Sequence, residues 1–152
     1  MGYAIIEFDG NPVALDYGII ETRSVGDMAH RLLELHISLQ SLISTYAPAV
    51  MAIEQLFFAR NVTTALTVGQ ARGVAMLAAA QSGLSVVEYT PAEVKQAVAG
   101  YGKADKNQIQ QMVRLLLDLE HPPTPDDAAD ALAIALCHGQ SHGFLSRVSE
   151  AG

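Results

Sequence analysis

The stretch MAIEQLFF, residues 51–58, decides how the fold is interpreted, because it sets one carboxylate into an apolar run. Such a run predicts a strand, from about Ala49 to Phe57, that is covered on both faces. Burying a lone carboxylate costs several kcal/mol, which is on the scale of the whole stability of a small domain. We therefore expect Glu54 to face a compensating charge.

The residues on either side of this strand predict an alternating α/β chain. The turn residues Asp9-Gly10-Asn11 separate two apolar runs and predict an antiparallel hairpin. Caps and helical spacing then give the expected order: strands 2–8 and 13–21, helix 27–47, strand 49–57, helix 61–82, strand 85–89, and helices 90–100, 105–117 and 125–138. This order predicts an α/β layered fold with a mixed sheet, in which strands 49–57 and 85–89 are parallel.

Length and composition favour one domain with one core. The chain has 152 residues, half of them apolar, and its single cysteine, Cys137, is expected to be a small buried residue. No apolar run is long enough to cross a bilayer, so we expect a soluble, cytoplasmic protein without a membrane partner. Residues 1–142 are expected to form the domain, and residues 143–152 a disordered tail after a helix that ends near His138.

The charge distribution is uneven along the chain. The net charge is −7, yet residues 60–114 carry six basic residues and only three acidic ones. A local basic zone is compatible with phosphate contacts because the local field matters more than the total charge. Charge alone nevertheless favours an ordinary mixed surface.

The acids Asp127 and Asp130 are three residues apart, so both carboxylates lie on one face of a helix. Acids at a helix start are also explained by capping and by the helix dipole. The following residues 131–136 are apolar, which predicts partial burial of Asp130. No Lys or Arg lies beside Glu54, Asp127 or Asp130 in sequence, so Mg²⁺ or Mn²⁺ is the expected compensating charge. Two such ions suit phosphodiester hydrolysis.

Two other patterns carry weaker predictions. Gly69 and Gly73 lie inside an expected helix, where glycine is unfavourable, and predict close packing against another backbone. His138 and His142 have a spacing seen in metal sites but lack the glutamate of the zincin motif, so a metal is not expected there.

Several motifs in order are similar to those of the bacterial RuvC crossover junction endonucleases. The resemblance extends from Gly2 to about His138. The matching segments are Glu54-Gln55-Leu56-Phe57, Gly69-Gln70-Ala71-Arg72-Gly73, Val94-Lys95-Gln96, Gly102 to Gln108, and Asp127 to Ala135.

The resemblance implies a ribonuclease-H-like fold and a homodimer that nicks four-way (Holliday) DNA junctions symmetrically in recombination and repair. It implies dependence on Mg²⁺, with two ions in each site, and partnership with the RuvA and RuvB branch-migration proteins. Glu54 and Asp127 match metal-binding, catalytic carboxylates, and Asp130 matches the nearby acid of the same motif. The expected DNA contacts are Phe57, Arg72, Lys95, Lys103 and Lys106.

One part of the family pattern is absent. The family begins with a central strand, Gly-Ile-Asp-Pro-Gly, whose Asp is the first catalytic carboxylate, whereas this sequence starts at Met1-Gly2-Tyr3. We expect a misplaced start or a truncated gene, unpaired backbone groups in the middle of the sheet and impaired cleavage. The alternatives are a dimer that binds junctions without cutting them, and another ribonuclease-H-like nuclease of the YqgF type.

Overall fold

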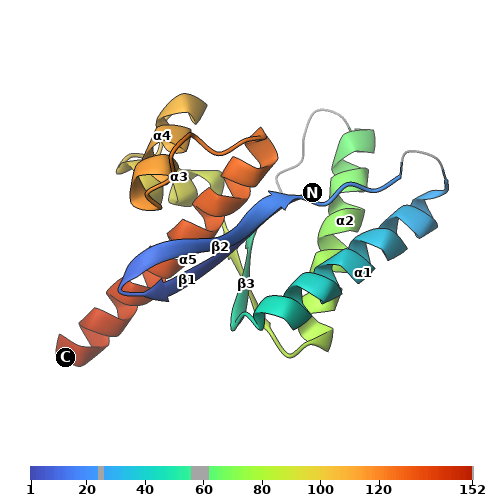
Figure 1. Ribbon diagram of the computed structural model, residues 1–152, viewed down its shortest axis with the longest axis horizontal. Helices are drawn as coiled ribbons and strands as arrows, with labels where there is room; N and C mark the ends of the chain where they lie inside the picture. Colours follow the sequence, from blue (N-terminus) through green and yellow to red (C-terminus); the bar gives the residue numbers. More distant parts are fainter. Residues whose placement is uncertain (24–25, 56–61, 152) are drawn as a thin grey trace. The chain divides into compact units, whose positions relative to one another are not determined.

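The computed structural model describes residues 1–23, 26–55 and 62–151, and the side chains of residues 1–142 within those ranges. The elements along the chain are β1 (Gly2–Asp9), β2 (Asn11–Ile19), α1 (Met28–Tyr46), β3 (Val50–Glu54), α2 (Val62–Gln81), β4 (Ser85–Tyr89), α3 (Pro91–Ala99), α4 (Lys106–Leu116) and α5 (Asp126–Ala151) (Figure 1). This order confirms the predicted alternation of strands and helices. No helix in the described residues is long and apolar enough to cross a membrane.

The chain divides into two compact units, each with its own buried cluster. One unit comprises Met1 and Ile20–Glu88, and the other comprises Gly2–Ile19 and Tyr89–Gly152. The assignment of one domain with one core stays a prediction. The described part of the chain has one apolar cluster in each unit. Its strands form two separate pairs, and no described strand joins these pairs into one sheet.

The second unit is built on a hairpin that lies along α5 (Figure 1). β1 and β2 are antiparallel, Tyr3 pairs with Gly18, and Gly10 makes the turn with a φ of 84°. Positive φ is the backbone region that glycine adopts without a steric penalty. Side chains of the hairpin pack on buried residues of three helices, which are Val94 and Val98, Ile109 and Val113, and Leu132, Leu136 and Cys137.

Local capping fixes where α3 and α4 begin. Thr90 accepts a hydrogen bond from the backbone of Glu93, whose carboxylate accepts one from the Thr90 backbone. Asp105 and Gln108 make the same reciprocal pair at the start of α4. Each box satisfies backbone N–H groups that a helix start leaves without partners. Both predicted starts are confirmed.

The first unit pairs two helices over a small sheet. α1 and α2 lie side by side and bury Leu35, Leu39 and Ile43 against Ala75 and Ala78. β3 and β4 form the sheet of this unit. None of the residues of β3 or β4 is fully buried, so the prediction that these strands are covered on both faces is wrong for the described structure.

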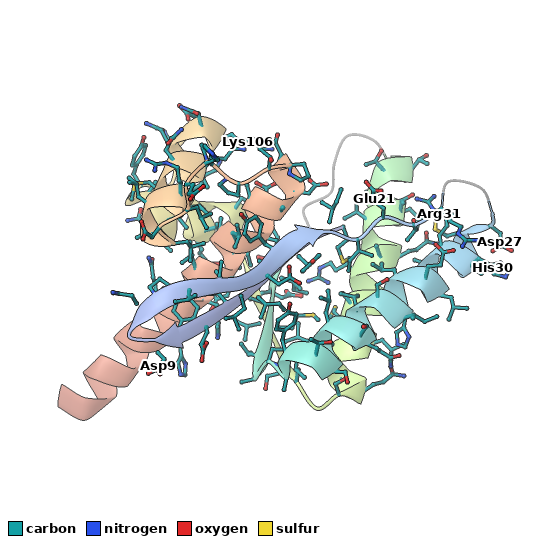
Figure 2. The ribbon with its side chains drawn as sticks, in the orientation of Figure 1. Asp9, Glu21, Asp27, His30, Arg31 and Lys106 are labelled. Carbon is teal, nitrogen blue, oxygen red and sulfur yellow. The ribbon has the colours of Figure 1, made fainter. Side chains whose placement is uncertain are left out.

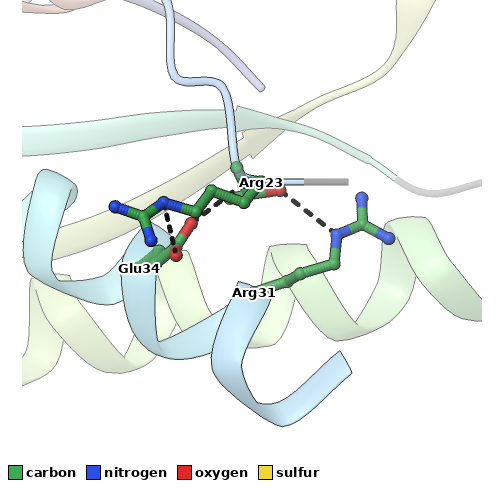
Figure 3. A network of polar contacts seen from close by, with 4 residues as sticks. Arg23, Arg31 and Glu34 are labelled. Carbon is green, nitrogen blue, oxygen red and sulfur yellow. Dashed lines mark hydrogen bonds and ion pairs between the residues drawn. The ribbon is translucent and has the colours of Figure 1, made fainter. Parts of the chain in front are cut away.

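Polar contacts tie the segment after β2 to α1 (Figure 3). The Arg23 backbone donates to Glu34 Oε2 over 3.0 Å, and the Arg23 Nε lies 3.8 Å from Glu34 Oε1. The Arg31 Nε donates to Thr22 Oγ1 over 3.3 Å. Exposed pairs of this kind contribute little free energy, but they set the path by which the chain enters α1.

The strands pair in two groups, and the last helix is longer than predicted. In the described ranges each sheet has two strands, β1 with β2 and β3 with β4. The helix expected to end near His138 continues as α5 to Ala151. Gly139 does not stop it, because an isolated glycine costs a helix only about 1 kcal/mol. The assignment of residues 1–142 as the domain stays a prediction.

Candidate metal and DNA-binding site

The first turn of α5 carries three acids on an otherwise buried helix start. The backbone N–H groups of Ala128 and Ala129 donate to the Pro125 carbonyl over 3.0 and 3.2 Å. Ala128, Ala129 and Leu132 are buried, so they hold this turn against the core. Asp126, Asp127 and Asp130 are consequently directed toward solvent.

Lys106 brings a positive charge to these acids from the start of α4 (Figure 2). Its Nζ lies 3.1 Å from Asp126 Oδ2 and 3.9 Å from Asp130 Oδ2. Gln110 adds a hydrogen bond from Nε2 to Asp126 Oδ1 over 2.9 Å. The hydrogen bond with Asp126 raises the pKa of Lys106, and the same bond lowers the pKa of Asp126.

Asp130 has a different electrostatic environment from Asp126. Its side chain is 50% exposed, and partial burial raises the pKa of its carboxyl. Lys106 acts in the opposite direction, while Asp127 and Asp126 raise the pKa of Asp130 further. The predicted partial burial of Asp130 is confirmed.

A positive side chain that sequence neighbours did not reveal also lies near Asp130. Lys106 reaches this acid across the gap between two helices. Sequence reasoning also left out Asp126, although it makes the shortest contact with Lys106. The capping pair Asp105 and Gln108 was the available signal, because it fixes where Lys106 begins α4.

Glu54 lies in the first unit and is described there alone. It is the last residue of β3 and is exposed, so the premise that its carboxylate is buried is wrong. Its burial was inferred from the apolar sequence around it. The strand ends at Glu54, where the side chain reaches solvent, and burial energetics no longer demand a compensating charge.

The predicted DNA contacts fall into three groups. Phe57 lies outside the described residues. Arg72 already has partners within the first unit. Its Nη2 pairs with Glu88 Oε1, and its Nη1 lies 3.3 Å from the Met76 sulfur. The Arg72 side chain is 22% exposed. Lys95 on α3 is half-buried.

Lys103, on the turn that leads into α4, and Lys106, the first residue of α4, are both exposed. Ala104 between them is 2% exposed and anchors the turn in the core of the second unit. Asp105 caps the helix. The two ammonium groups are thus carried on a fixed backbone, which suits contact with a phosphate chain.

The chemistry of the donor set fits Mg²⁺. Asp127 and Asp130 offer carboxylate oxygens, and Mg²⁺ is commonly held by one or two carboxylates together with water and substrate phosphates. Within the described residues, no group of three or more His, Cys, Asp or Glu side chains is arranged to hold a metal ion. The α5 acids of the second unit can therefore supply part of a coordination shell.

The remaining candidates serve packing in this structure. The Tyr89 hydroxyl lies 2.7 Å from His138 Nδ1, and the His138 ring stacks on His142 with centroids 6.0 Å apart. Burial lowers the pKa of His138. Cys137 is 1% exposed, which confirms the prediction of a small buried residue, and burial raises the pKa of its thiol.

Comparison with solved structures shows which known fold the chain shares. Thermus thermophilus RuvC in complex with a Holliday junction substrate aligns with a TM-score of 0.88 and 34% identity, covering 93% of this chain and 87% of that one. A second Thermus thermophilus RuvC structure aligns with a TM-score of 0.84 at the same identity, covering 94% and 87%. Fold and site together define an α/β protein of the ribonuclease-H-like nuclease class.

Sequence comparison gives the family. The model of the family described as crossover junction endodeoxyribonuclease RuvC matches residues 1–138. The RuvC protein of Heliobacterium modesticaldum is 58% identical over an alignment of 149 residues that covers 96% of this chain and 92% of that protein. The RuvC protein of Desulfitobacterium hafniense is 56% identical over an alignment of 152 residues that covers 99% of this chain and 92% of that protein. The chain belongs to the RuvC family of crossover junction endodeoxyribonucleases.

Proposed function

We propose that this protein resolves four-way DNA junctions by nicking two strands symmetrically during recombination and repair. The observation that carries the proposal is the alignment with Thermus thermophilus RuvC in complex with a Holliday junction, at a TM-score of 0.88. The family model matches residues 1–138, a range that contains all of the motifs named above, and this match also supports the proposal. It also favours this reading over a YqgF-type nuclease.

In this proposal, lysines of the second unit contact the phosphates of the junction. Lys103 just before α4 and Lys106 at its first position are exposed, and Lys95 on α3 is half-buried. Phe57 is proposed to stack on a base, by resemblance alone. Arg72 is proposed as a weaker contact, because its guanidinium already pairs with Glu88.

The proposed metal ligands are Glu54, Asp127 and Asp130. The assignment of Glu54 comes from its motif, while the α5 acids are also supported by their exposure and oxygen-only chemistry. These carboxylates would hold Mg²⁺, two ions in each site by resemblance to the family, and the bound metal would supply an activated water and charge stabilisation for the leaving oxygen. Mn²⁺ has the same ligand preference and is expected to substitute.

A homodimer is supported by the outer face of α2. Val62, Leu66 and Leu77 are 79%, 62% and 53% exposed, and they follow a helical stripe that also contains Gly69 and Gly73. A Cβ at either glycine would meet nothing within 4 Å, so the predicted close packing is not made within the described chain. A second copy of α2 would provide it, because an apolar stripe with small residues lets two helices approach closely.

The remaining assignments follow from the family. The protein is proposed to work in the cytoplasm with the RuvA and RuvB branch-migration proteins, and residues 1–142 are proposed as its nuclease domain. Neither partner is identified by a described surface. Pull-down of the purified chain with each partner in turn, on junction DNA, tests the association.

The function is tested with a mobile four-way junction. A gel shift in Ca²⁺, together with symmetric but impaired nicking in Mg²⁺, is the expected result, because the first catalytic carboxylate of the family has no match in the sequence. A hybrid RNA/DNA duplex and a linear duplex serve as control substrates. Preference for either control over the junction would contradict the proposal.

A second candidate is a dimer that binds junctions without cutting them. It is favoured by one observation: the single charge of Lys106 lies within 4 Å of two acids of α5, and the described residues contain no group of three side chains arranged to bind a metal. A gel shift in Ca²⁺ without nicking in Mg²⁺ or Mn²⁺ is the result that would select this candidate.

A further inference from the structure

β1 approaches α5 closely at two points, one near each end of the strand. At Gly2, a Cβ would overlap the backbone carbonyl of Asp127 and lie 3.0 Å from the Asp127 Cβ. At Gly139 of α5, a Cβ would overlap the ring of Phe8. Gly2 and Phe8 are near the two ends of β1, so the strand and the helix are fixed in register over this length.

The two contacts differ in what a side chain would displace. The obstacle at Gly139 is the Phe8 ring, which is 42% exposed and can rotate into solvent. The obstacle at Gly2 is the backbone of the first turn of α5, which has no free rotation of its own. A side chain at position 2 requires either that turn or the end of β1 to shift.

The first turn of α5 has no room to move inward. Ala128, Ala129 and Leu132 are at most 1% exposed, and close-packed cores resist displacement by even a methylene. If the turn yields, a side chain at position 2 would therefore shift it away from β1. Asp127 would move with it, because its own carbonyl is the atom in contact.

We infer that Gly2 is a positioning residue for Asp127, setting where the Asp127 carboxylate meets a divalent cation and the DNA phosphate. The inference rests on the proposed function for the role of Asp127. The contact between the backbones of Gly2 and Asp127 does not depend on that function. Gly2 has no group that could bind metal, so its whole effect passes through the placement of the first turn of α5.

The test compares Gly2→Ala with Gly139→Ala in the full chain. Both substitutions add one methyl to the same strand–helix interface, but only the first meets Asp127. The amide signals of Asp127–Asp130 in ¹⁵N–¹H spectra report the turn directly, and Mn²⁺ titration followed by electron paramagnetic resonance reports the site. Thermal unfolding of both variants controls for a general loss of stability.

Gly2→Ala is expected to shift the Asp127 amide signal and to weaken Mn²⁺ binding by roughly 10-fold to 100-fold, the range seen when a residue supporting a metal ligand is removed. Gly139→Ala is expected to leave both readouts close to those of the parent chain. An unshifted Asp127 amide in Gly2→Ala, or equal shifts in the two variants, would overturn the inference.

The outcomes also separate this inference from the proposed function. A parent chain that neither nicks junctions nor binds Mn²⁺ would refute the metal site, while the Asp127 amide shift would still decide the role of Gly2. If Gly2→Ala does not fold, the contact between Gly2 and Asp127 is tested in the parent chain instead. A nuclear Overhauser effect between the Gly2 and Asp127 α-protons is expected there, and its absence would contradict the contact.

Discussion

The ammonium nitrogen of Lys106 lies 3.1 Å from a carboxylate oxygen of Asp126 at the start of α5. The same nitrogen is 3.9 Å from Asp130, one helical turn further on. A lysine proposed to contact DNA thus pairs with Asp126 and lies near Asp130, which is proposed to bind metal. Arrival of a cation and a phosphate at this site would compete directly with the ion pair.

The proposed metal ligands give the first prediction. Glu54→Gln and Asp127→Asn are expected to reduce junction nicking by more than roughly 100-fold, the scale lost with a catalytic charged group. Junction binding in Ca²⁺ should change little, because phosphate contacts come from the lysines. Glu7→Gln, an exposed acid on β1, is the control. Full nicking by Glu54→Gln would show that Glu54 has no catalytic role.

The lysines just before α4 and at its first position give the second prediction. Lys103→Ala and Lys106→Ala are each expected to reduce the slope of log affinity against log salt by about 0.9, since each removes one phosphate contact. The slope is measured by fluorescence anisotropy with a labelled junction. Arg23→Ala, which removes an exposed charge paired with Glu34, is the control and should leave the slope unchanged. An unchanged slope in both lysine variants would remove this segment from the DNA interface.

The Arg72–Glu88 pair gives the third prediction. The Arg72 side chain is only 22% exposed, and its Nε is buried with no hydrogen-bond partner among the described atoms. Arg72→Ala should lower the free energy of unfolding by about 1 kcal/mol, because the partly exposed pair with Glu88 and the packing of the Arg72 stem are both lost. Chemical denaturation of Arg72→Ala, Glu88→Ala and the double variant measures the coupling. Additive losses would mean that the pair contributes nothing.

The exposed stripe of α2 gives the fourth prediction. Leu66→Glu is expected to convert the dimer to a monomer, because it places a charge in the apolar centre of the proposed interface. Light scattering after size-exclusion chromatography measures the mass. Ile37→Glu, at an α1 position that is 56% exposed, is the matched control and should stay dimeric. A dimer that tolerates Leu66→Glu would place the interface elsewhere.

The acids of α5 give a fifth prediction, in which the pH dependence of stability has opposite signs for Asp126 and Asp130. The pKa of Asp126 is lowered by Lys106, so its stabilising effect is present above its unfolded pKa and is lost as pH falls through the folded pKa. Asp126→Asn should therefore be less stable than the parent chain at neutral pH. The difference should disappear only as pH falls below the lowered folded pKa of Asp126, where both states are protonated.

Asp130 should behave in the reverse sense. Burial raises its pKa, so the folded state gains stability as pH falls through that pKa and carries a penalty at neutral pH. Asp130→Asn should stabilise the neutral-pH fold by less than about 1 kcal/mol, because the half-exposed carboxylate is screened by solvent. Thermal unfolding from neutral pH to below the folded pKa of Asp126 measures both variants. A lower melting temperature for Asp130→Asn at neutral pH would reverse this assignment.

Much of the secondary structure could be predicted because its causes are local. The pair Thr90 and Glu93 and the pair Asp105 and Gln108 lie within one turn of chain, so their capping boxes are visible in sequence. The hairpin turn at Gly10 is equally local. The burial of Glu54 was mispredicted because neighbouring apolar residues do not fix where a strand ends or which groups cover it.

The sequence by itself determined the order of strands and helices, the caps and the family motifs, since hydrogen bonds within a few residues and short fixed spacings encode them. Only the tertiary structure decided that Lys106 meets Asp126, that Arg72 meets Glu88 and that Gly2 leaves room for Asp127. Each of these contacts joins segments far apart in the chain. Their distances depend on how helices and strands pack, which no local pattern specifies.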